Sequence, residues 1–359
     1  MGLQPVSAEE TVEAVRSYSC LRIAGARSKP RLSEGEGDLL EMTSLTGITE
    51  YEASEYTFTA RAGTSLEEVT EVLAKKGQYL PFDPMFVRSG ATLGGAVGSG
   101  ISGAGRFRFG GLRDFLIGVQ FVDGRGRIRR GGGKVVKNAA GFDFPKLMVG
   151  SLGRFGVLTE VTFKVFPAPV ARRTVRIRCD QAEGAVERMA AIATSRWEAE
   201  ALGWNANAGT IHVRLGGPPV AVEALAGEIA ARWPEGAEQL SDEEALSYWE
   251  GMGEQLWRGE DEVVVKVPLS PSRIPAFERG LPSPGQAKRV YDSGGSVGWI
   301  AVGRDAVEDL DRALRELNLR GLVVQGEKGK PLWLGRDEDS AVVAAVKEVF
   351  DPEDRFLEL

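Results

Sequence analysis

Residues 89–105 restrict the fold of this chain more than any other feature, because they are small nearly throughout. They read SGATLGGAVGSGISGAG in one-letter code. Side chains of this size cannot fill an ordinary core, so the backbone becomes the main interacting surface. Successive backbone N–H groups in such a segment can form a nest for the oxygens of a pyrophosphate. The other interpretations are a flexible loop or a glycine-rich packing surface.

Two common nucleotide-binding patterns do not fit this segment. A Walker A loop ends in Gly-Lys-Ser or Gly-Lys-Thr, and neither tripeptide closes the stretch. The dinucleotide fold of NAD enzymes needs a strand, its glycines and a ribose-binding acid in a fixed order, and that order is also missing. A conventional NAD or ATP site is therefore disfavoured.

The rest of the first half is predicted to mix helices with short strands. Apolar residues at helical spacing indicate a helix over 6–19. Thr64 or Ser65 caps a second amphipathic helix, which Gly77 ends. Strands are expected at residues 21–24, 39–43, 48–53, 57–62, 115–122 and 157–165, with a hairpin-like turn at 124–126.

A change of composition at Pro167-Ala168-Pro169 predicts a domain boundary, because an X-Pro pair disfavours helix. Beyond it strands alternate with helices, which indicates a separate α+β domain. The strands are expected at 174–178, 209–215, 263–267 and 297–302, and the helices at 183–194, 220–232, 304–316 and 341–350. The predicted domains are 1–168 and 169–330, with a C-terminal segment, 331–359, that returns to the first.

Charge and apolar runs narrow the possible partners. The formal net charge is -7 and the pI about 5.2, so the surface would repel a nucleic-acid backbone. No run of about 18 apolar residues occurs, and Met1–Thr11 lacks the basic and apolar parts of a signal peptide. The sequence therefore predicts no nucleic-acid partner, no transmembrane segment and a cytoplasmic location.

Cysteine and histidine are scarce. Cys20 and Cys179 are the only cysteines, and we interpret them as free thiols rather than as a disulfide framework or a metal cluster. His212, the only histidine, alternates with Ile211 and Val213 on an expected strand, so a structural role is favoured over a catalytic one. No metal site is predicted.

Several short motifs follow one another along the chain. They are Leu21–Lys29, Ala62–Leu66, Gly77–Pro84, Ala91–Gly95, Gly100–Gly103, Arg113–Asp114, Lys137–Asp143, Leu147–Gly153 and Gly156–Val161. In this order they resemble the FAD-linked oxidases with a flavin domain of the vanillyl-alcohol-oxidase, or PCMH, type. They are similar within that family to the small flavin subunits of bacterial glycolate oxidases, which share the Gly-x-x-Ser-Lys form of the first loop in place of a triple glycine.

This resemblance, which is specific over roughly residues 20–170, implies a fold and a cofactor. The fold is α+β, with a PCMH-type FAD-binding domain of two α+β subdomains and a smaller α+β cap domain. The cofactor is FAD, held non-covalently, because neither Cys20, Cys179 nor His212 lies in a segment like a flavin-attachment site. The implied cofactor-binding residues are Ala24, Gly25, Ala26, Arg27, Ser28, Lys29, Pro81, Gly90, Ala91, Thr92, Leu93, Gly94, Gly95, Ser99, Ser102, Gly103, Gly156 and Val157.

The resemblance also implies a function. The chain is expected to be the FAD-binding subunit of a complex that oxidises glycolate, a small 2-hydroxy acid, to glyoxylate. Its expected partners are a larger FAD subunit and an iron–sulfur subunit, which receive electrons from the flavin and through which the protein would reach the inner membrane. The catalytic residues stay unassigned. Activity without partners is not expected, because the histidine-rich cap site of related dehydrogenases is missing here.

Two alternatives stay open. The first is a self-sufficient FAD-dependent oxidoreductase of another small alcohol or hydroxy acid, with Tyr248, Tyr291 or Asp292 as base. The second is a structural subunit that has lost its flavin. 

A basic cluster in the first domain also has more than one interpretation. A solvated, salt-bridged face is favoured over a nucleic-acid patch, because charge runs usually face solvent. A third interpretation places Arg106 or Arg108 near the flavin pyrimidine, where a positive charge stabilises the reduced ring. The cluster consists of Arg106, Arg108, Arg113, Arg125, Arg127, Arg129 and Arg130.

Overall fold

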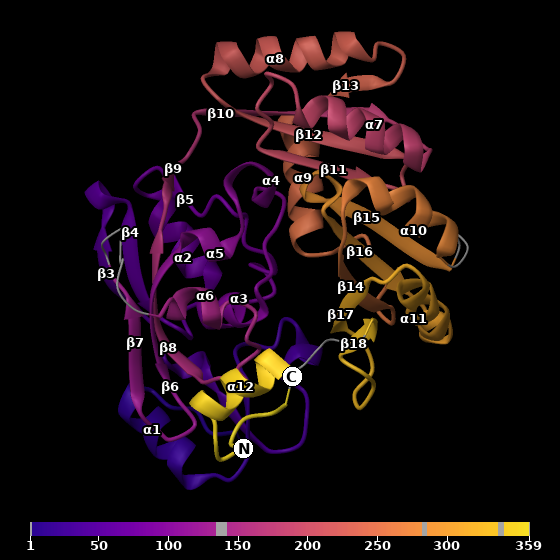
Figure 1. Ribbon diagram of the computed structural model, residues 1–359. Coiled ribbons are helices and arrows are strands. Elements are labelled where there is room, and N and C mark those ends of the chain that lie inside the picture. The colour runs from indigo at the N-terminus through magenta and orange to yellow at the C-terminus, as the bar shows by residue number, and fades with distance from the viewer. Residues whose placement is uncertain (1, 134–141, 282–285, 337–340, 359) are drawn as a thin grey trace. The chain divides into compact units, whose positions relative to one another are not determined.

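The computed structural model describes residues 2–133, 142–281, 286–336 and 341–358 (Figure 1). The chain forms two compact units. The first contains Met1–Ser102, Gly111–Ala168 and Glu338–Leu359, and the second contains Gly103–Gly110 and Pro169–Asp337. The chain thus passes between the units more often than one boundary near Pro169 requires.

The first unit is organised around a five-stranded antiparallel sheet in the order β3-β4-β8-β6-β7. Its strands are β3 (Ile48–Glu52), β4 (Thr57–Arg61), β6 (Leu116–Val122), β7 (Ile128–Gly132) and β8 (Val157–Lys164). Buried and partly exposed residues alternate along most of β8, as in a strand with one face against a core. The ring of Phe163 lies 5.8 Å from that of Phe58 and 6.0 Å from that of Phe82, so aromatic side chains fill this core.

Two strand pairs and several helices complete this unit. β1 (Leu21–Ala24) runs parallel to β2 (Asp38–Glu41), and β5 (Gln78–Tyr79) pairs with β9 (Phe166–Pro167). The helices are α1 (Ala8–Ser17), α2 (Leu66–Ala74), α3 (Leu93–Ser99), α5 (Leu112–Phe115), α6 (Phe144–Met148), α12 (Ala341–Phe350) and the 3-10 helices η1 (Pro30–Ser33), η2 (Met42–Ser44) and η3 (Ala53–Glu55). Ser7 and Ser65 cap α1 and α2, because each hydroxyl accepts the N–H of the third residue after it at 3.1 Å.

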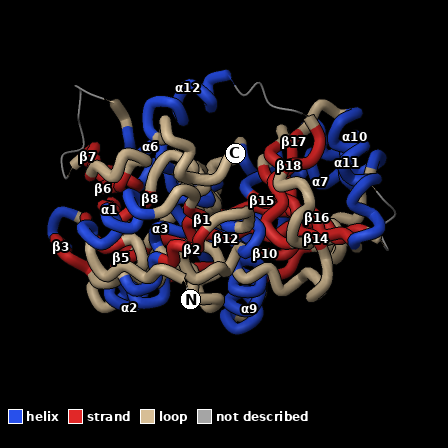
Figure 2. Tube along the Cα trace, turned by 90° about the horizontal axis from the view of Figure 1, so that it is seen from below, coloured by secondary structure: helices blue, strands red, loops and turns tan. Residues whose placement is uncertain are grey.

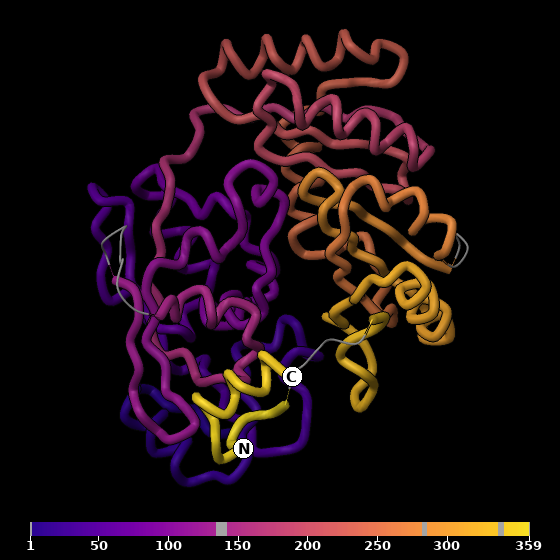
Figure 3. The backbone as a smooth tube through the Cα atoms, in the orientation of Figure 1, coloured from indigo at the N-terminus to yellow at the C-terminus, as the bar shows by residue number. Residues whose placement is uncertain are grey.

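The C-terminal segment packs against the start of the chain within this unit (Figure 3). Leu21 forms an isolated parallel bridge with Phe356, and its N–H donates to the Arg355 carbonyl at 2.6 Å. The Arg355 guanidinium donates to the Tyr18 carbonyl at 2.7 Å. Strand β1 therefore has hydrogen-bonded neighbours in both β2 and the C-terminal segment.

The second unit contains a nine-stranded sheet in the order β13-β10-β12-β11-β15-β16-β14-β17-β18. Its strands are β10 (Ala171–Arg178), β11 (Ala201–Asn205), β12 (Thr210–Gly217), β13 (Ala237–Gln239), β14 (Val263–Pro268), β15 (Ala287–Asp292), β16 (Val297–Val302), β17 (Arg320–Gln325) and β18 (Trp333–Gly335). Its helices are α4 (Arg106–Phe109), α7 (Ala182–Ala193), α8 (Pro219–Arg232), α9 (Asp242–Gly253), α10 (Ile274–Gly280), α11 (Val307–Glu316) and the 3-10 helices η4 (Pro271–Arg273), η5 (Ser293–Gly295) and η6 (Arg304–Ala306).

The two faces of this sheet differ in character. Helices α7, α8, α10 and α11 contribute buried residues to one core, together with alternate residues of the strands. Figure 2 shows α7, α10 and α11 on the same side of the strands. The opposite face carries polar residues of β10 and β12, and α9 packs there through the ring of Tyr248, which stacks on His212. Both units therefore mix helices with sheet, as the sequence predicts for an α+β fold.

Candidate functional site

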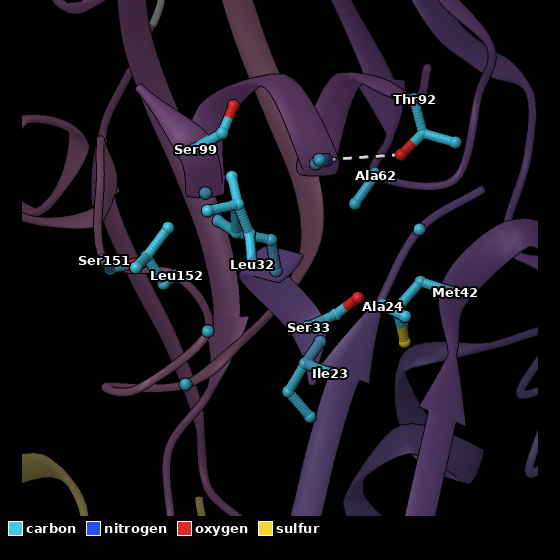
Figure 4. Close-up of a pocket in the computed structure, with 17 residues that line it drawn as sticks. Ile23, Ala24, Leu32, Ser33, Met42, Ala62, Thr92, Ser99, Ser151 and Leu152 are labelled. Carbon is cyan, nitrogen blue, oxygen red and sulfur yellow. Dashed lines mark hydrogen bonds between the residues drawn. The ribbon is translucent and has the colours of Figure 1, made fainter. Parts of the chain in front are cut away.

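The first unit contains a pocket where the end of β1, helix α3 and the loop before β8 meet (Figure 4). The empty space within it is about 610 Å³, part of which is open to solvent. Its lining is Ile23, Ala24, Gly25, Leu32, Ser33, Met42, Ala62, Thr92, Gly94, Gly95, Gly98, Ser99, Ser151, Leu152, Gly153, Gly156 and Leu158.

Gly25 allows the end of β1 to approach helix α3. A Cβ at Gly25 would lie 2.4 Å from the Thr92 hydroxyl oxygen, which is too close for any side chain. That same hydroxyl caps α3 by accepting the Gly95 N–H at 3.2 Å, drawn as the dashed line in Figure 4. The glycine after β1 is therefore required by contact with the helix cap.

Three glycines of α3 have different surroundings. The Gly94 N–H donates to the Ala62 carbonyl at 2.7 Å, and a Cβ at Gly94 would lie 2.9 Å from the Ala62 Cβ. A Cβ at Gly95 would meet only the Thr92 hydroxyl, at 3.1 Å. At Gly98 it would meet no atom within 4 Å, although Gly98 lines the pocket. The helix thus packs at Gly94 and leaves its backbone uncovered at Gly98.

The loop before β8 closes another side of the pocket. The Leu152 N–H donates to the Gly98 carbonyl at 2.9 Å, which joins this loop to α3. Gly153 has a φ of 73° and no room for a side chain, since its Cβ would lie 2.9 Å from the Ile23 Cβ. The Ser151 side chain is buried, and its hydroxyl has no hydrogen-bond partner among the residues that the structure describes.

The pocket is suited to a polar ligand that the backbone recognises. None of the described residues that line it has a charged side chain. Its polar groups are therefore peptide groups and the hydroxyls of Ser33, Thr92, Ser99 and Ser151. A buried hydroxyl without a partner costs free energy, and a ligand oxygen or nitrogen beside Ser151 removes that cost. Backbone recognition of this kind is what a nest for a pyrophosphate requires.

Some of the predicted cofactor-binding residues lie together in the lining of this pocket. Those that line the pocket are Ala24, Gly25, Thr92, Gly94, Gly95, Ser99 and Gly156. Those outside its lining are Ala26, Arg27, Ser28, Lys29, Pro81, Gly90, Ala91, Leu93, Ser102, Gly103 and Val157.

Several of the residues outside the lining have other contacts. Arg27 pairs with Glu41 at 3.0 Å, and Lys29 lies 4.9 Å from the centre of the Phe86 ring. The Ser102 hydroxyl accepts the Leu112 N–H at 2.9 Å. These side chains hold the surrounding loops. The motif Lys137–Asp143 lies outside the described residues as far as Gly141.

Several residues that line the pocket were not predicted as cofactor-binding residues from the sequence. They are Ile23, Leu32, Ser33, Met42, Ala62, Gly98, Ser151, Leu152, Gly153 and Leu158. Gly98 stands inside the small-residue stretch, and Ser151 to Gly153 end the motif Leu147–Gly153, so both signals were present. Leu32 and Met42 belong to neither, because tertiary packing alone brings η1 and η2 to the pocket.

Two candidate bases of the second unit, Tyr248 and Tyr291, are poorly suited to accept a proton, and so is His212. The Tyr291 ring is fully buried, and its hydroxyl donates to Glu278. Burial raises the pKa of both Tyr248 and Tyr291 above the usual value of 10, so both stay protonated at neutral pH. Asp292 accepts the Ser293 N–H at 2.6 Å and caps η5. Burial, and then the Arg176 charge, lowers the pKa of His212 to about 3.

The arginine cluster is partly salt-bridged. Arg129 pairs with the buried Asp123 at 2.8 Å, and Arg108 pairs with Glu198 at 3.0 Å. Asp123 also accepts the N–H groups of Arg125 and Arg127, at 3.0 and 2.9 Å, and so shapes the turn between β6 and β7. These contacts support the interpretation of a salt-bridged surface.

Other kinds of site are not found in the described part of the chain. Cys20 and Cys179 are both free thiols there, the first partly exposed and the second buried. No group of three or more His, Cys, Asp or Glu among the described residues could hold a metal ion. Nor do those residues include a helix that is long and apolar enough to cross a membrane.

Comparison with known protein families finds a match over the first part of the chain, which contributes most of the pocket lining. Residues 3–132 match the family described as FAD binding domain. This part of the chain is therefore similar to FAD-binding domains. The predicted family resemblance is confirmed, and so is FAD as the cofactor.

Three curated proteins show which members of such families this chain resembles in sequence. The chain is 40% identical over 169 residues to glycolate oxidase subunit GlcE of Escherichia coli, covering 47% of this chain and 48% of that one. It is 29% identical over 160 residues to glycolate oxidase subunit GlcD of Bacillus subtilis, covering 45% and 34%. It is 31% identical over 172 residues to D-2-hydroxyglutarate dehydrogenase of Xanthomonas citri, covering 46% and 36%. The chain thus spans about half or less of the length of these curated relatives.

A solved structure resembles the whole chain. It is an alkyldihydroxyacetonephosphate synthase, with a TM-score of 0.70 and 16% sequence identity, covering 98% of this chain and 75% of that one. At this identity the likeness shows the fold alone. It confirms the predicted α+β fold, with a PCMH-type FAD-binding domain and a second α+β domain.

Proposed function

We propose that this chain is the FAD-binding subunit of a glycolate oxidase or glycolate dehydrogenase complex. In that complex it takes part in the oxidation of glycolate, a 2-hydroxy acid, to glyoxylate, and electrons pass through its flavin to partner subunits. The main support is the pocket of the first unit, which offers peptide groups and the unpartnered Ser151 hydroxyl to a polar cofactor. Similarity to two glycolate oxidase subunits supports the substrate.

The residues present fit FAD. Gly25, Gly95 and Gly98 bring peptide groups to the pocket without side chains, and Ser99 and Ser151 add hydroxyls. These residues would hold the cofactor through hydrogen bonds and close packing rather than through ion pairs. Bound FAD supplies a two-electron acceptor for the carbon that carries the substrate hydroxyl. 

The attachment of FAD is non-covalent in this proposal. Neither cysteine of the chain, Cys20 or Cys179, lines the pocket, and neither does its one histidine, His212. Acid precipitation of the purified chain is therefore expected to release all of the yellow colour. Flavin that stays in the washed pellet would contradict a non-covalent site.

The chain alone is incomplete as a catalyst in this proposal. Oxidation of a hydroxy acid needs a base whose pKa lies near the working pH. Tyr248 and Tyr291 are held protonated, and His212, with a pKa of about 3, is a weak base. We infer that the larger FAD subunit supplies the base, and that an iron–sulfur subunit receives the electrons. The complex is cytoplasmic, and any contact with the inner membrane is made through those partners.

Two measurements test the proposal. The absorption spectrum of the purified chain is expected to have the yellow band of bound FAD, and a colourless, folded chain would leave only a structural subunit. A tagged chain drawn from its native source is expected to retain a larger FAD subunit and an iron–sulfur subunit. A yellow chain recovered without partners, and active on an alcohol by itself, would favour the self-sufficient oxidoreductase instead.

A further inference from the structure

The second unit has a cavity on the polar face of its sheet. Cross-strand register places four polar residues side by side there, because Arg176 lies opposite His212 and Arg178 lies opposite Thr210. On the other side of β12, Asn205 lies opposite Thr210. The cavity is lined by Arg176, Arg178, Asn205, Ala208, Thr210, His212, Pro234, Glu235, Gly236, Ala237, Glu238 and Tyr248, and none of these lines the flavin pocket.

Two side chains of this cavity have buried polar atoms without hydrogen-bond partners among the described residues. His212 is only 3% exposed, and its Nδ1 has no hydrogen-bond partner in the described part of the chain. The buried hydroxyl oxygen of Thr210, two residues away on the same face of β12, has none either. The Tyr248 ring stacks on His212, with ring centres 3.6 Å apart and planes 14° apart, so one face of the imidazole is covered. Unpartnered polar groups at one place indicate a missing polar ligand.

The charges at this cavity are of two kinds. Arg176 is neutralised by Glu238, whose carboxylate lies 2.7 Å from its guanidinium. Arg178 is exposed, and the structure gives it no side-chain ion pair within the described residues, although Glu235 also lines the cavity. A free guanidinium offers a planar set of N–H donors that matches a carboxylate or a phosphate. The neutral imidazole and the threonine hydroxyl each add one donor.

We propose that this cavity binds a small oxyanion, a carboxylate or a phosphate, with Arg178 as the charged anchor and Thr210 and His212 as neutral hydrogen-bond donors. The imidazole is neutral at pH 7, because burial and the Arg176 charge lower its pKa to about 3. One ring nitrogen of a neutral imidazole carries a proton and needs an acceptor. An anion oxygen beside His212 and Thr210 supplies it, and Arg178 balances the charge.

The test uses His212 as its own reporter, because it is the only histidine in the chain. The flavin-loaded full chain, labelled with isotopic histidine, gives one imidazole signal by nuclear magnetic resonance. Glycolate and inorganic phosphate are titrated separately at pH 7, against sodium chloride at equal ionic strength. We expect a saturable shift of the imidazole signal that chloride does not produce. The anion that saturates at lower concentration identifies the ligand class.

Matched variants make the result decisive. Arg178→Gln removes the anchor from an exposed position, and is expected to weaken binding at least about ten-fold, as loss of one charge-assisted contact implies. Arg312→Gln removes an exposed arginine of α11 and is expected to leave binding unchanged. Both variants should keep their flavin absorbance, so that failure here is distinguishable from failure of the FAD proposal. Absence of a saturable shift, or equal affinity in Arg178→Gln, would overturn the proposal.

Discussion

Gly94, Gly95 and Gly98 lie on one short helix, yet a side chain at each would have a different effect. At Gly94 the new Cβ would press against Ala62, so Gly94→Glu disturbs the packing of α3 as well as the cofactor. Gly98 has open space, so Gly98→Glu enters the pocket without a steric clash in the protein. The better probe of the flavin site is therefore Gly98, with Gly95 next.

We predict that Gly98→Glu abolishes FAD binding and leaves the chain folded, because the new carboxylate occupies the pocket and repels phosphate. Flavin absorbance per folded chain, with circular dichroism to check folding, measures this. The matched control is Gly227→Glu in α8, an exposed helical glycine that also has no atom within 4 Å of a built Cβ. Full flavin content in Gly98→Glu would show that the cofactor binds elsewhere.

His212 gives a second prediction at the scale of one residue. Its pKa is 6.5 in an unfolded chain and about 3 in the folded protein, so only the unfolded chain takes up a proton between those values. Above about pH 6.5 the ionisation of His212 does not change the free energy of unfolding. Below that pH it lowers the free energy of unfolding by about 1.4 kcal/mol for each pH unit, until about pH 3. We predict that urea unfolding shows a steeper loss of stability from pH 7 to 5 in the wild type than in His212→Gln. Parallel pH profiles would contradict a buried neutral imidazole.

Among the elements, the C-terminal segment depends on one buried carboxylate. Asp351 is 1% exposed and accepts the N–H groups of Arg355 and Phe356 at 2.9 Å each. The Lys347 ammonium also lies 2.6 Å from it. Asp351 therefore joins the end of α12 to the segment that contacts β1.

We predict that Asp351→Ala lowers the free energy of unfolding of the first unit by about 3 kcal/mol, because it leaves two N–H groups without their acceptor and removes the close ion pair of the largely buried Lys347. Asp354→Ala is the control, since that side chain is 80% exposed and lies 3.6 Å from Lys347. Its effect should be within about 0.5 kcal/mol. Chemical denaturation followed by circular dichroism measures both. Equal effects of the two changes would mean that the burial of Asp351 does not contribute to the free energy of unfolding.

The elements also show how far a sequence can predict this fold. Strands with a distinct β-prone run, such as 21–24 and 157–165, were predicted almost at their bounds. Strands β11, β15 and β17 were missed, because each contains at most two β-branched residues and so has a weak strand signal, whereas β16 has three and was predicted at its bounds. The site follows the same rule: Gly25 and Thr92 stand in local motifs, whereas Leu32 and Met42 reach the pocket only through tertiary packing.

For the whole molecule we predict that the FAD-loaded chain alone does not oxidise glycolate or lactate at a useful rate. In the described part of the second unit, Tyr248 and Tyr291 stay protonated at neutral pH and His212 is a weak base, so none of these three side chains is suited to take the hydroxyl proton. The measurement is anaerobic addition of excess substrate, with flavin bleaching followed over minutes. Bleaching that begins only after the larger FAD subunit is added agrees with the proposed function. Rapid bleaching of the isolated chain would contradict it.

The placement of Gly103–Gly110 has a consequence for how such a protein can evolve by recombination. This stretch is counted with the second unit, where the Phe107 ring packs beside Gly294, although the segments on both sides of it belong to the first. Neither unit is therefore encoded by one uninterrupted piece of gene. A single recombination event that exchanged residues 169–336 would deliver a graft lacking Phe107, with its place filled by the recipient's own loop. Residues 103–110 and 169–336 must be exchanged together to keep their contacts, so one recombination event cannot transfer the second unit intact.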